Sequence, residues 1–284
     1  FLMPALQSLV SIKKLIEQTR QHSRPAQGSY VVPSLWVAGQ HLQKPHQLKI
    51  DPYDFFSGAV DAILKSGNAS IKPTADGNWT REAVIYHMFV RTTCAFDHNG
   101  NGKLDLSVNQ EGWRETGTFL KAVALLPYIK SLGVNVIHLL PVTSIGSDGR
   151  KGTLGSPYAI RNPYKLDPNL SEPNIGAGVE EEFKAFVEAA HHLGIRVVVE
   201  FVFRTSAKDA DWVAEYPDWF YWIQRSVPDR QPASQDESAY GAPFFTQDEL
   251  RSIHGKIERG DFHDLVPPHP VYRDMFTGPP KKQS

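Results

Sequence analysis

The sequence alternates short apolar runs with amphipathic segments between residues 83 and 203, and this alternation favours a parallel α/β fold. Three apolar runs predict buried strands, at 84–90, 134–140 and 195–203. Helical spacing of apolar residues predicts helices at Thr118–Leu132 and Val179–Leu193, each followed by a glycine, Gly133 or Gly194, that ends it. Three such strand–helix units suit the start of an eight-unit TIM barrel, although a doubly wound sheet would show the same pattern.

The flanking segments predict a three-part organisation. Residues 1–78 form an N-terminal extension, with helices expected at Leu6–Gln21 and Tyr53–Leu64 and short strands expected at 30–32 and 35–37. Residues 79–223 carry the strand–helix units, and residues 224–284 are polar and Pro-rich, which suits an insertion after the third strand. Because the chain does not begin with methionine, we expect it to be a fragment.

Composition narrows the classes of function. The net charge of −1, from 30 basic and 31 acidic residues, provides no long-range electrostatic field that would attract nucleic acid or an anionic membrane. No stretch approaches the roughly 18 consecutive apolar residues of a membrane span. The single cysteine, Cys94, cannot close an intrachain disulfide. We therefore expect a cytoplasmic globular protein that binds neither nucleic acid nor membrane.

The segment from Asp97 to Asp105 has the spacing of a cation-binding loop. Oxygen donors stand at alternate positions with glycine at the sixth, and the predicted ligands are Asp97, Asn99, Asn101, the Lys103 carbonyl and Asp105. Calcium is the natural candidate, although the twelfth position is Val108 rather than the glutamate of an EF-hand. The alternative is an Asn/Gly-rich turn without a metal. The regular alternation favours the metal.

Charged residues at the end of the third predicted strand are the next candidates for a site. Glu200 and Arg204 lie in an otherwise apolar run, so we expect an ion pair or a polar network there. Barrel enzymes place their sites at the carboxyl ends of strands. The pair therefore fits either a structural role or the orientation of a sugar hydroxyl or a carboxylate in a pocket.

Five segments together resemble family 13 of the glycoside hydrolases, the α-amylase family, and lie at 84–91, 97–105, 132–142, 156–168 and 194–205. The second of them resembles the calcium loop that several members carry after the first strand. The resemblance implies that Tyr158 stacks on the sugar ring next to the bond that is cleaved. The last segment is similar to the family's Asp-x-Val-x-Asn-His signature, with Glu200, Arg204 and Thr205 in place of its aspartate, asparagine and histidine. Arg204 and Thr205, together with residues 217–223, resemble maltosyltransferases and related α-glucan transferases more than secreted amylases.

The resemblance implies the first three βα units of a TIM (β/α)8 barrel, left incomplete, and an α-glucan or maltooligosaccharide substrate. The family cleaves with retention, using carboxylates at the fourth and fifth strands about 5 Å apart. Neither motif occurs before Ser284, so we predict no catalytic residue in this chain and expect it to be inactive alone. The alternative is a non-catalytic carbohydrate-binding or regulatory protein on the same frame.

Overall fold

The computed structural model describes residues 6–23, 30–37, 45–67, 69, 71, 78–148, 150, 152, 154–203, 205–207, 209–216, 222–223, 248, 251, 255, 259 and 276–277. The chain divides into two compact units, Phe1–Ala210 and Asp211–Ser284. In the second unit, helix α6 spans Asp211–Glu215, and strands β8 (Trp222–Ile223) and β9 (Phe276–Thr277) pair antiparallel.

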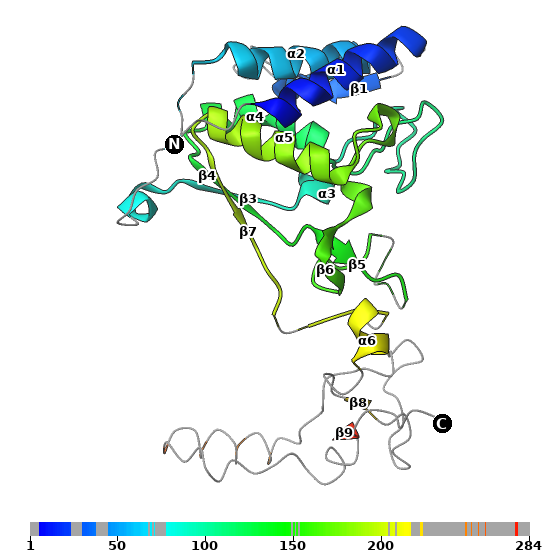
Figure 1. The fold of residues 1–284 in the computed structure, drawn as a ribbon, viewed down its shortest axis with the longest axis vertical. Helices are drawn as coiled ribbons and strands as arrows, with labels where there is room; N and C mark the ends of the chain where they lie inside the picture. Colours follow the sequence, from blue (N-terminus) through cyan, green and yellow to red (C-terminus); the bar gives the residue numbers. More distant parts are fainter. Residues whose placement is uncertain are drawn as a thin grey trace. The chain divides into compact units, whose positions relative to one another are not determined.

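The centre of the first unit is a parallel sheet of the three predicted strands (Figure 1). They are β3 (Ile85–Met88), β4 (Val136–Leu139) and β7 (Arg196–Val199), in the order β3-β4-β7. Both pairings are parallel, and Ile85, Val136 and Arg196 share one row of the register. The structure therefore confirms parallel βα units, and the described strands do not close into a barrel.

Each strand is shorter than its apolar run, and two predicted strand positions are wrong. Val90 begins a short helix, α3 (Val90–Thr93), because the N–H groups of Thr92 and Thr93 bond back to the Phe89 carbonyl. Similarly, residues 35–37 do not form a strand. The backbone there turns into a 3-10 helix, η1 (Ser34–Trp36), and the Val37 N–H donates to the Ser34 carbonyl.

Two helices cover one side of the sheet (Figure 1). Helix α4 (Phe119–Ser131) begins at Thr118, whose side chain accepts the Lys121 N–H, and helix α5 (Val179–His192) begins after Gly178. Gly133 and Gly194 follow them with φ values of 82° and 73°, the left-handed backbone that ends a helix. The other face of the sheet carries exposed Ile85 and Val198. No helix among the described residues is long and apolar enough to span a membrane.

The N-terminal region packs on these helices rather than standing apart. Helices α1 (Gln7–His22) and α2 (Pro52–Lys65) form a further layer, with α1 against α5 and α2 against α4 (Figure 1). Strands β1 (Tyr30–Pro33) and β2 (Gln47–Ile50) pair antiparallel beside them. Glu188 of α5 accepts the first N–H groups of α1, from Ser8 and Leu9. These groups have no partner within their own helix, so α5 caps α1.

A hairpin not predicted from the sequence follows the second parallel strand. Strand β5 (Thr143–Ile145) pairs antiparallel with β6 (Ile160–Leu166), with irregular register between them. Two 3-10 turns, η3 (Pro168–Leu170) and η4 (Pro173–Ile175), then lead into α5. The connection between β5 and β6 contains Tyr158, which contacts Glu200 and Thr205 beyond the end of β7.

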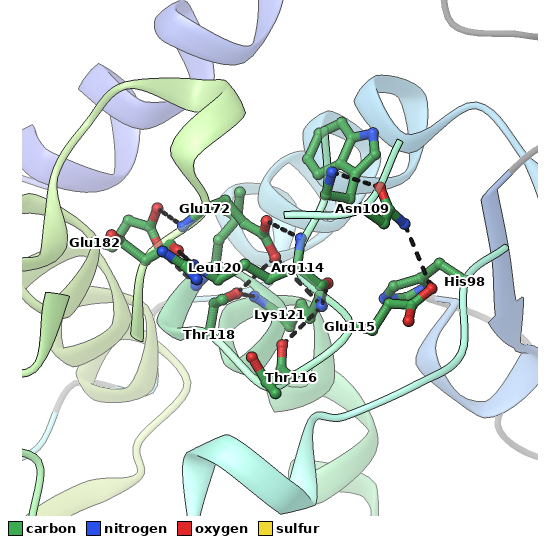
Figure 2. Close-up of polar contacts among 12 residues, drawn as sticks. His98, Asn109, Arg114, Glu115, Thr116, Thr118, Leu120, Lys121, Glu172 and Glu182 are labelled. Carbon is green, nitrogen blue, oxygen red and sulfur yellow. Dashed lines mark hydrogen bonds and ion pairs between the residues drawn. The ribbon is translucent and has the colours of Figure 1, made fainter. Parts of the chain in front are cut away.

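A buried ion pair lies where α4 begins (Figure 2). The side chains of Lys121 and Glu172 are both fully buried, with Nζ 3.3 Å from Oε1. The Lys121 ammonium also donates to the carbonyls of Arg114 and Thr116. Burial lowers the pKa of Lys121, while Glu172 raises it. A buried charge of this kind is tolerated only because partners surround it.

Glu182, on the first turn of α5, extends this network (Figure 2). Its two carboxylate oxygens accept the backbone N–H groups of Leu120, at 3.1 Å, and Glu172, at 2.7 Å. Desolvation, together with the nearby Glu172 carboxylate, raises the pKa of Glu182 to about 8, although both N–H donors act in the opposite direction. The folded protein therefore holds a proton on Glu182 in neutral solution.

This proton predicts a pH dependence of stability. An unfolded chain releases it near the ordinary pKa of 4.5, whereas the folded protein keeps it to about pH 8. The free energy of unfolding should therefore fall as pH rises between these values, by at most about 1.4 kcal/mol per pH unit, and the contribution should level off above. Glu182→Gln, which stays neutral, should lack this slope in urea unfolding at pH 5 to 9.

The exposed neighbour Glu180 supplies the control, because Glu180→Gln changes the same charge on the same helix turn. That variant should keep the parent's slope. Parallel pH profiles for the parent protein and Glu182→Gln would contradict the assignment of the buried proton.

Candidate functional site

Three of the four predicted sugar-site residues meet at the carboxyl edge of the parallel sheet. Glu200 directly follows β7, and its N–H donates to the Leu139 carbonyl of β4. The Tyr158 hydroxyl donates to Glu200 Oε2 at 3.1 Å, and the Thr205 hydroxyl donates to the Tyr158 carbonyl at 3.0 Å. The fourth residue, Arg204, lies outside the described residues.

This cluster combines an accessible ring with polar groups. Tyr158 is 40% exposed, and desolvation and the Glu200 carboxylate both raise its pKa. The tyrosine therefore keeps its hydroxyl proton and acts as a hydrogen-bond donor to Glu200. A ring face beside a carboxylate and a hydroxyl is suited to a ligand with apolar C–H faces and hydroxyl groups, which is the chemistry of a sugar.

A buried arginine holds the Tyr158 segment against the sheet edge. Arg91 on α3 is 6% exposed, and its guanidinium donates to the Leu154 carbonyl and to the Asp167 carboxylate. Burial lowers the pKa of Arg91, and Asp167 opposes this shift. Asp167 also accepts the Asn169 N–H at 3.0 Å, which begins η3. Arg91 was not predicted as a site residue, although a charged residue directly after an apolar run is a visible signal in the sequence.

A small cavity of about 70 Å³ lies beside this arginine, lined by Arg91, Leu106, Thr116, Arg150, Leu154 and Asn169. Pockets for drug-sized ligands measure about 300–1,000 Å³, and a water molecule occupies about 30 Å³ in the liquid. The cavity is therefore too small for an oligosaccharide. The Tyr158 cluster remains the better candidate for sugar contact.

The predicted cation loop is wound around the side chain of Asp97. Its Oδ1 accepts the N–H groups of Gly100 and Asn101, at 2.8 and 3.1 Å, and its Oδ2 accepts that of Gly102 at 2.7 Å. Gly100 and Gly102 have φ values of 73° and 80°, which favour glycine there. The Asn99 side chain similarly accepts the Asn101 N–H at 2.9 Å.

A second carboxylate, Glu115, fastens the two ends of this loop from inside. It is fully buried, and its oxygens accept the N–H of Asp105 at 2.8 Å and that of Asn99 at 3.4 Å. Figure 2 shows it beside His98 and Asn109. No local pattern predicts this role, because Glu115 lies ten residues beyond the loop in the sequence.

The same loop is fastened to the N-terminal strand β1. His98 stacks on Tyr30 with ring centroids 4.0 Å apart, and burial together with Lys121 lowers the pKa of His98 to about 3. The ring is therefore neutral, and its Nδ1 lies 2.7 Å from the Val31 carbonyl, to which it donates. The Val31 N–H in turn donates to the His98 carbonyl at 3.1 Å.

The donors of this loop fit a hard cation. Carboxylate, amide and carbonyl oxygens are the ligands that calcium takes. Asp97 Oδ2 and Asn99 Oδ1 each accept one N–H, so each keeps a further lone pair. Among the described residues, no three His, Cys, Asp or Glu side chains gather as metal ligands. The predicted ligand set contains only two such residues, Asp97 and Asp105, and its remaining donors are amides and a backbone carbonyl.

Parallel βα units with polar residues at the carboxyl edge of the sheet place this chain in the α/β class of proteins. The family described as "Alpha amylase, catalytic domain" matches residues 97–255, more than half of the chain. The chain belongs to this family. The resemblance found in the sequence is thereby confirmed.

Among curated relatives, the α-1,4-glucan:maltose-1-phosphate maltosyltransferase of Mycolicibacterium smegmatis is 33% identical over 208 residues, covering 66% of this chain and 27% of the relative. The enzyme of the same name from Chlorobaculum tepidum is 37% identical over 116 residues, covering 37% of this chain and 17% of the relative. The chain thus spans about a quarter or less of the length of these relatives.

Solved structures of α-amylases also match. The α-amylase of Lactobacillus plantarum is 30% identical, with a TM-score of 0.38, and the match covers 52% of this chain and 30% of that one. A maltogenic α-amylase, AmyB of Thermotoga neapolitana, is 32% identical, with a TM-score of 0.36, and covers 49% of this chain and 27% of that one.

Proposed function

We propose that this chain is the N-terminal part of an α-glucan-active enzyme that cleaves α-1,4-glucosidic bonds with retention, as a hydrolase or a transglycosylase. Its substrate is an α-glucan or a maltooligosaccharide. Membership of the α-amylase family supports this proposal, as do relatives named as maltosyltransferases acting with α-1,4-glucan. Hydrolysis and transfer differ only in whether water or a sugar hydroxyl reaches the covalent intermediate.

The observation that carries the proposal is the contact of Tyr158 with Glu200 and Thr205. It joins a residue of the hairpin to residues that follow the third parallel strand, at the sheet edge where barrel enzymes bind substrate. The proposed role of Tyr158 is to stack on a sugar ring. Glu200 and Thr205 hold the tyrosine in place and offer polar atoms to sugar hydroxyls, and Arg204 is a further proposed member of this subsite.

In the proposed enzyme, β3, β4 and β7 are the first three strands of a (β/α)8 barrel. The sheet face opposite α4 and α5 then becomes the barrel interior, which accounts for exposed apolar side chains such as Ile85 on that face. The nucleophile and the acid/base stand on the fourth and fifth strands of the family's barrel, about 5 Å apart. We therefore propose that the 284 residues alone bind without turnover.

The replacements at the family signature favour one alternative, a non-catalytic carbohydrate-binding or regulatory protein. Glu200 stands where the family has aspartate, and Thr205 stands where it has histidine. A threonine hydroxyl cannot supply the positive charge that an imidazolium provides. A binding protein would tolerate both changes.

Activity on maltoheptaose tests the proposal and separates it from this alternative. The 284-residue chain should release no reducing sugar, whereas a protein that continues through the family's remaining strands should turn over. In that longer protein, Tyr158→Ala should lower kcat/KM by about 10- to 100-fold, because a stacking contact of about 1–3 kcal/mol is lost. The control is Tyr164→Ala, which removes an 83% exposed ring on β6 and should leave kcat/KM unchanged.

Two outcomes would contradict the proposal. Maltoheptaose binding by the longer protein without any turnover would favour the non-catalytic alternative. Equal losses of kcat/KM in Tyr158→Ala and Tyr164→Ala would remove the special role of the Tyr158 cluster.

We further propose that the loop from Asp97 to Asp105 binds calcium through Asp97, Asn99, Asn101, the Lys103 carbonyl and Asp105. The Asx-type hydrogen bonds and the buried Glu115 hold the loop in a compact form, so little chain entropy is lost on binding. The ion's contribution is structural: it would stabilise the edge of the sheet near Arg91 and Tyr158.

Calcium should therefore raise the Tm of the 284-residue chain, because a ligand that binds only the folded state stabilises it. Asp97→Asn keeps the shape of the side chain but removes a charge, and should abolish most of the shift. Asn101→Asp adds a charge at an adjacent ligand position and should enlarge it. Differential scanning fluorimetry with calcium and with chelator measures both. Equal shifts in the two variants, or no shift in the parent, would contradict the calcium proposal.

A further inference from the structure

Two histidines face each other on neighbouring strands of the parallel sheet. His87 on β3 and His138 on β4 are register partners, so the backbone places them side by side. Their Nδ1 atoms lie 3.0 Å apart, and the ring centroids lie 4.8 Å apart with planes inclined by 69°. The pair therefore brings two nitrogen donors together on rigid elements.

The pair lies on the sheet face away from α4 and α5. The next residues along the two strands, Met88 and Leu139, are 0% exposed and belong to the core under the helices. Side chains alternate along a strand, so His87 and His138 point to the opposite face. In the 284-residue chain His87 is exposed and His138 is half-buried, so a small ion can reach the nitrogen pair.

The spacing of the two nitrogens suits a transition metal. Bonds of about 2.0–2.1 Å to two nitrogens 3.0 Å apart subtend about 94° at the metal. This angle is close to the right angle of tetragonal Cu²⁺ or Ni²⁺ and somewhat below the tetrahedral angle of Zn²⁺. Imidazole suits all three ions, whereas the oxygen donors of the loop at Asp97 suit calcium.

We propose that His87 and His138 form a bidentate site for a divalent transition metal, Cu²⁺, Ni²⁺ or Zn²⁺, with water completing the coordination. Strand register fixes both ligands, and sites on strands hold their geometry better than sites on loops. The third residue of this row is Val198 of β7, which lies two positions before Glu200 in the sequence. The metal therefore binds on the sheet face opposite α4 and α5.

Titration of the untagged 284-residue chain with NiCl₂ by isothermal calorimetry tests this site. His87→Gln and His138→Gln should each weaken binding at least tenfold, and the double variant should resemble either single one, because one bidentate site needs both rings. His22→Gln, an exposed histidine on α1, should leave the affinity unchanged.

Parent affinity in either single variant, or losses that add in the double variant, would show independent surface imidazoles and overturn the proposal. Circular dichroism checks that each variant is folded. A second measurement does not depend on the variants: the Cu²⁺ complex of the parent chain should show two equatorial imidazole nitrogens by electron paramagnetic resonance. Fewer than two would mean that the histidines only hydrogen bond to each other.

Discussion

The buried ion pair between Lys121 and Glu172 is the interaction on which the rest of the first unit depends. Both side chains are fully buried, so neither charge has water to solvate it. Removing one partner of such a pair costs about 3–5 kcal/mol, because an uncompensated charge stays behind. The surrounding groups must therefore supply donors and acceptors. The carbonyls of Arg114 and Thr116 accept from Lys121, and the Thr118 hydroxyl and the Arg114 N–H donate to Glu172.

This network joins the segments that carry the two candidate sites. The carbonyls that bind Lys121 flank Glu115, whose carboxylate closes the loop at Asp97. Glu172 lies five residues after Asp167, which anchors the Tyr158 hairpin through Arg91. One buried cluster thus connects the Asp97–Asp105 loop with the segment that leads to the Tyr158 hairpin. The function that we propose depends on this connection.

The sequence predicted the elements whose cause is local and missed those whose cause is distant. Helical periodicity located α4 and α5, and apolar runs located β3, β4 and β7, but not their ends, since local hydrogen bonds turn Val90 into a helix. The β5–β6 hairpin has no clear alternation and was not predicted. The resemblance identified Tyr158, Glu200 and Thr205, which the structure places in contact, whereas Glu115 and Arg91 act through partners remote in sequence. Roles in sugar binding stay predictions.

A double-mutant cycle on the buried ion pair tests the central claim most directly. The free energy of unfolding by urea would be measured for the parent chain, Lys121→Met, Glu172→Gln and the double variant. Each single change should lower the free energy of unfolding by about 3–5 kcal/mol. The double change should lower it by much less than the sum of the two, because removing both partners leaves no unpaired charge. Single losses below about 1 kcal/mol, or costs that add within about 0.5 kcal/mol, would show that the pair does not hold the unit together.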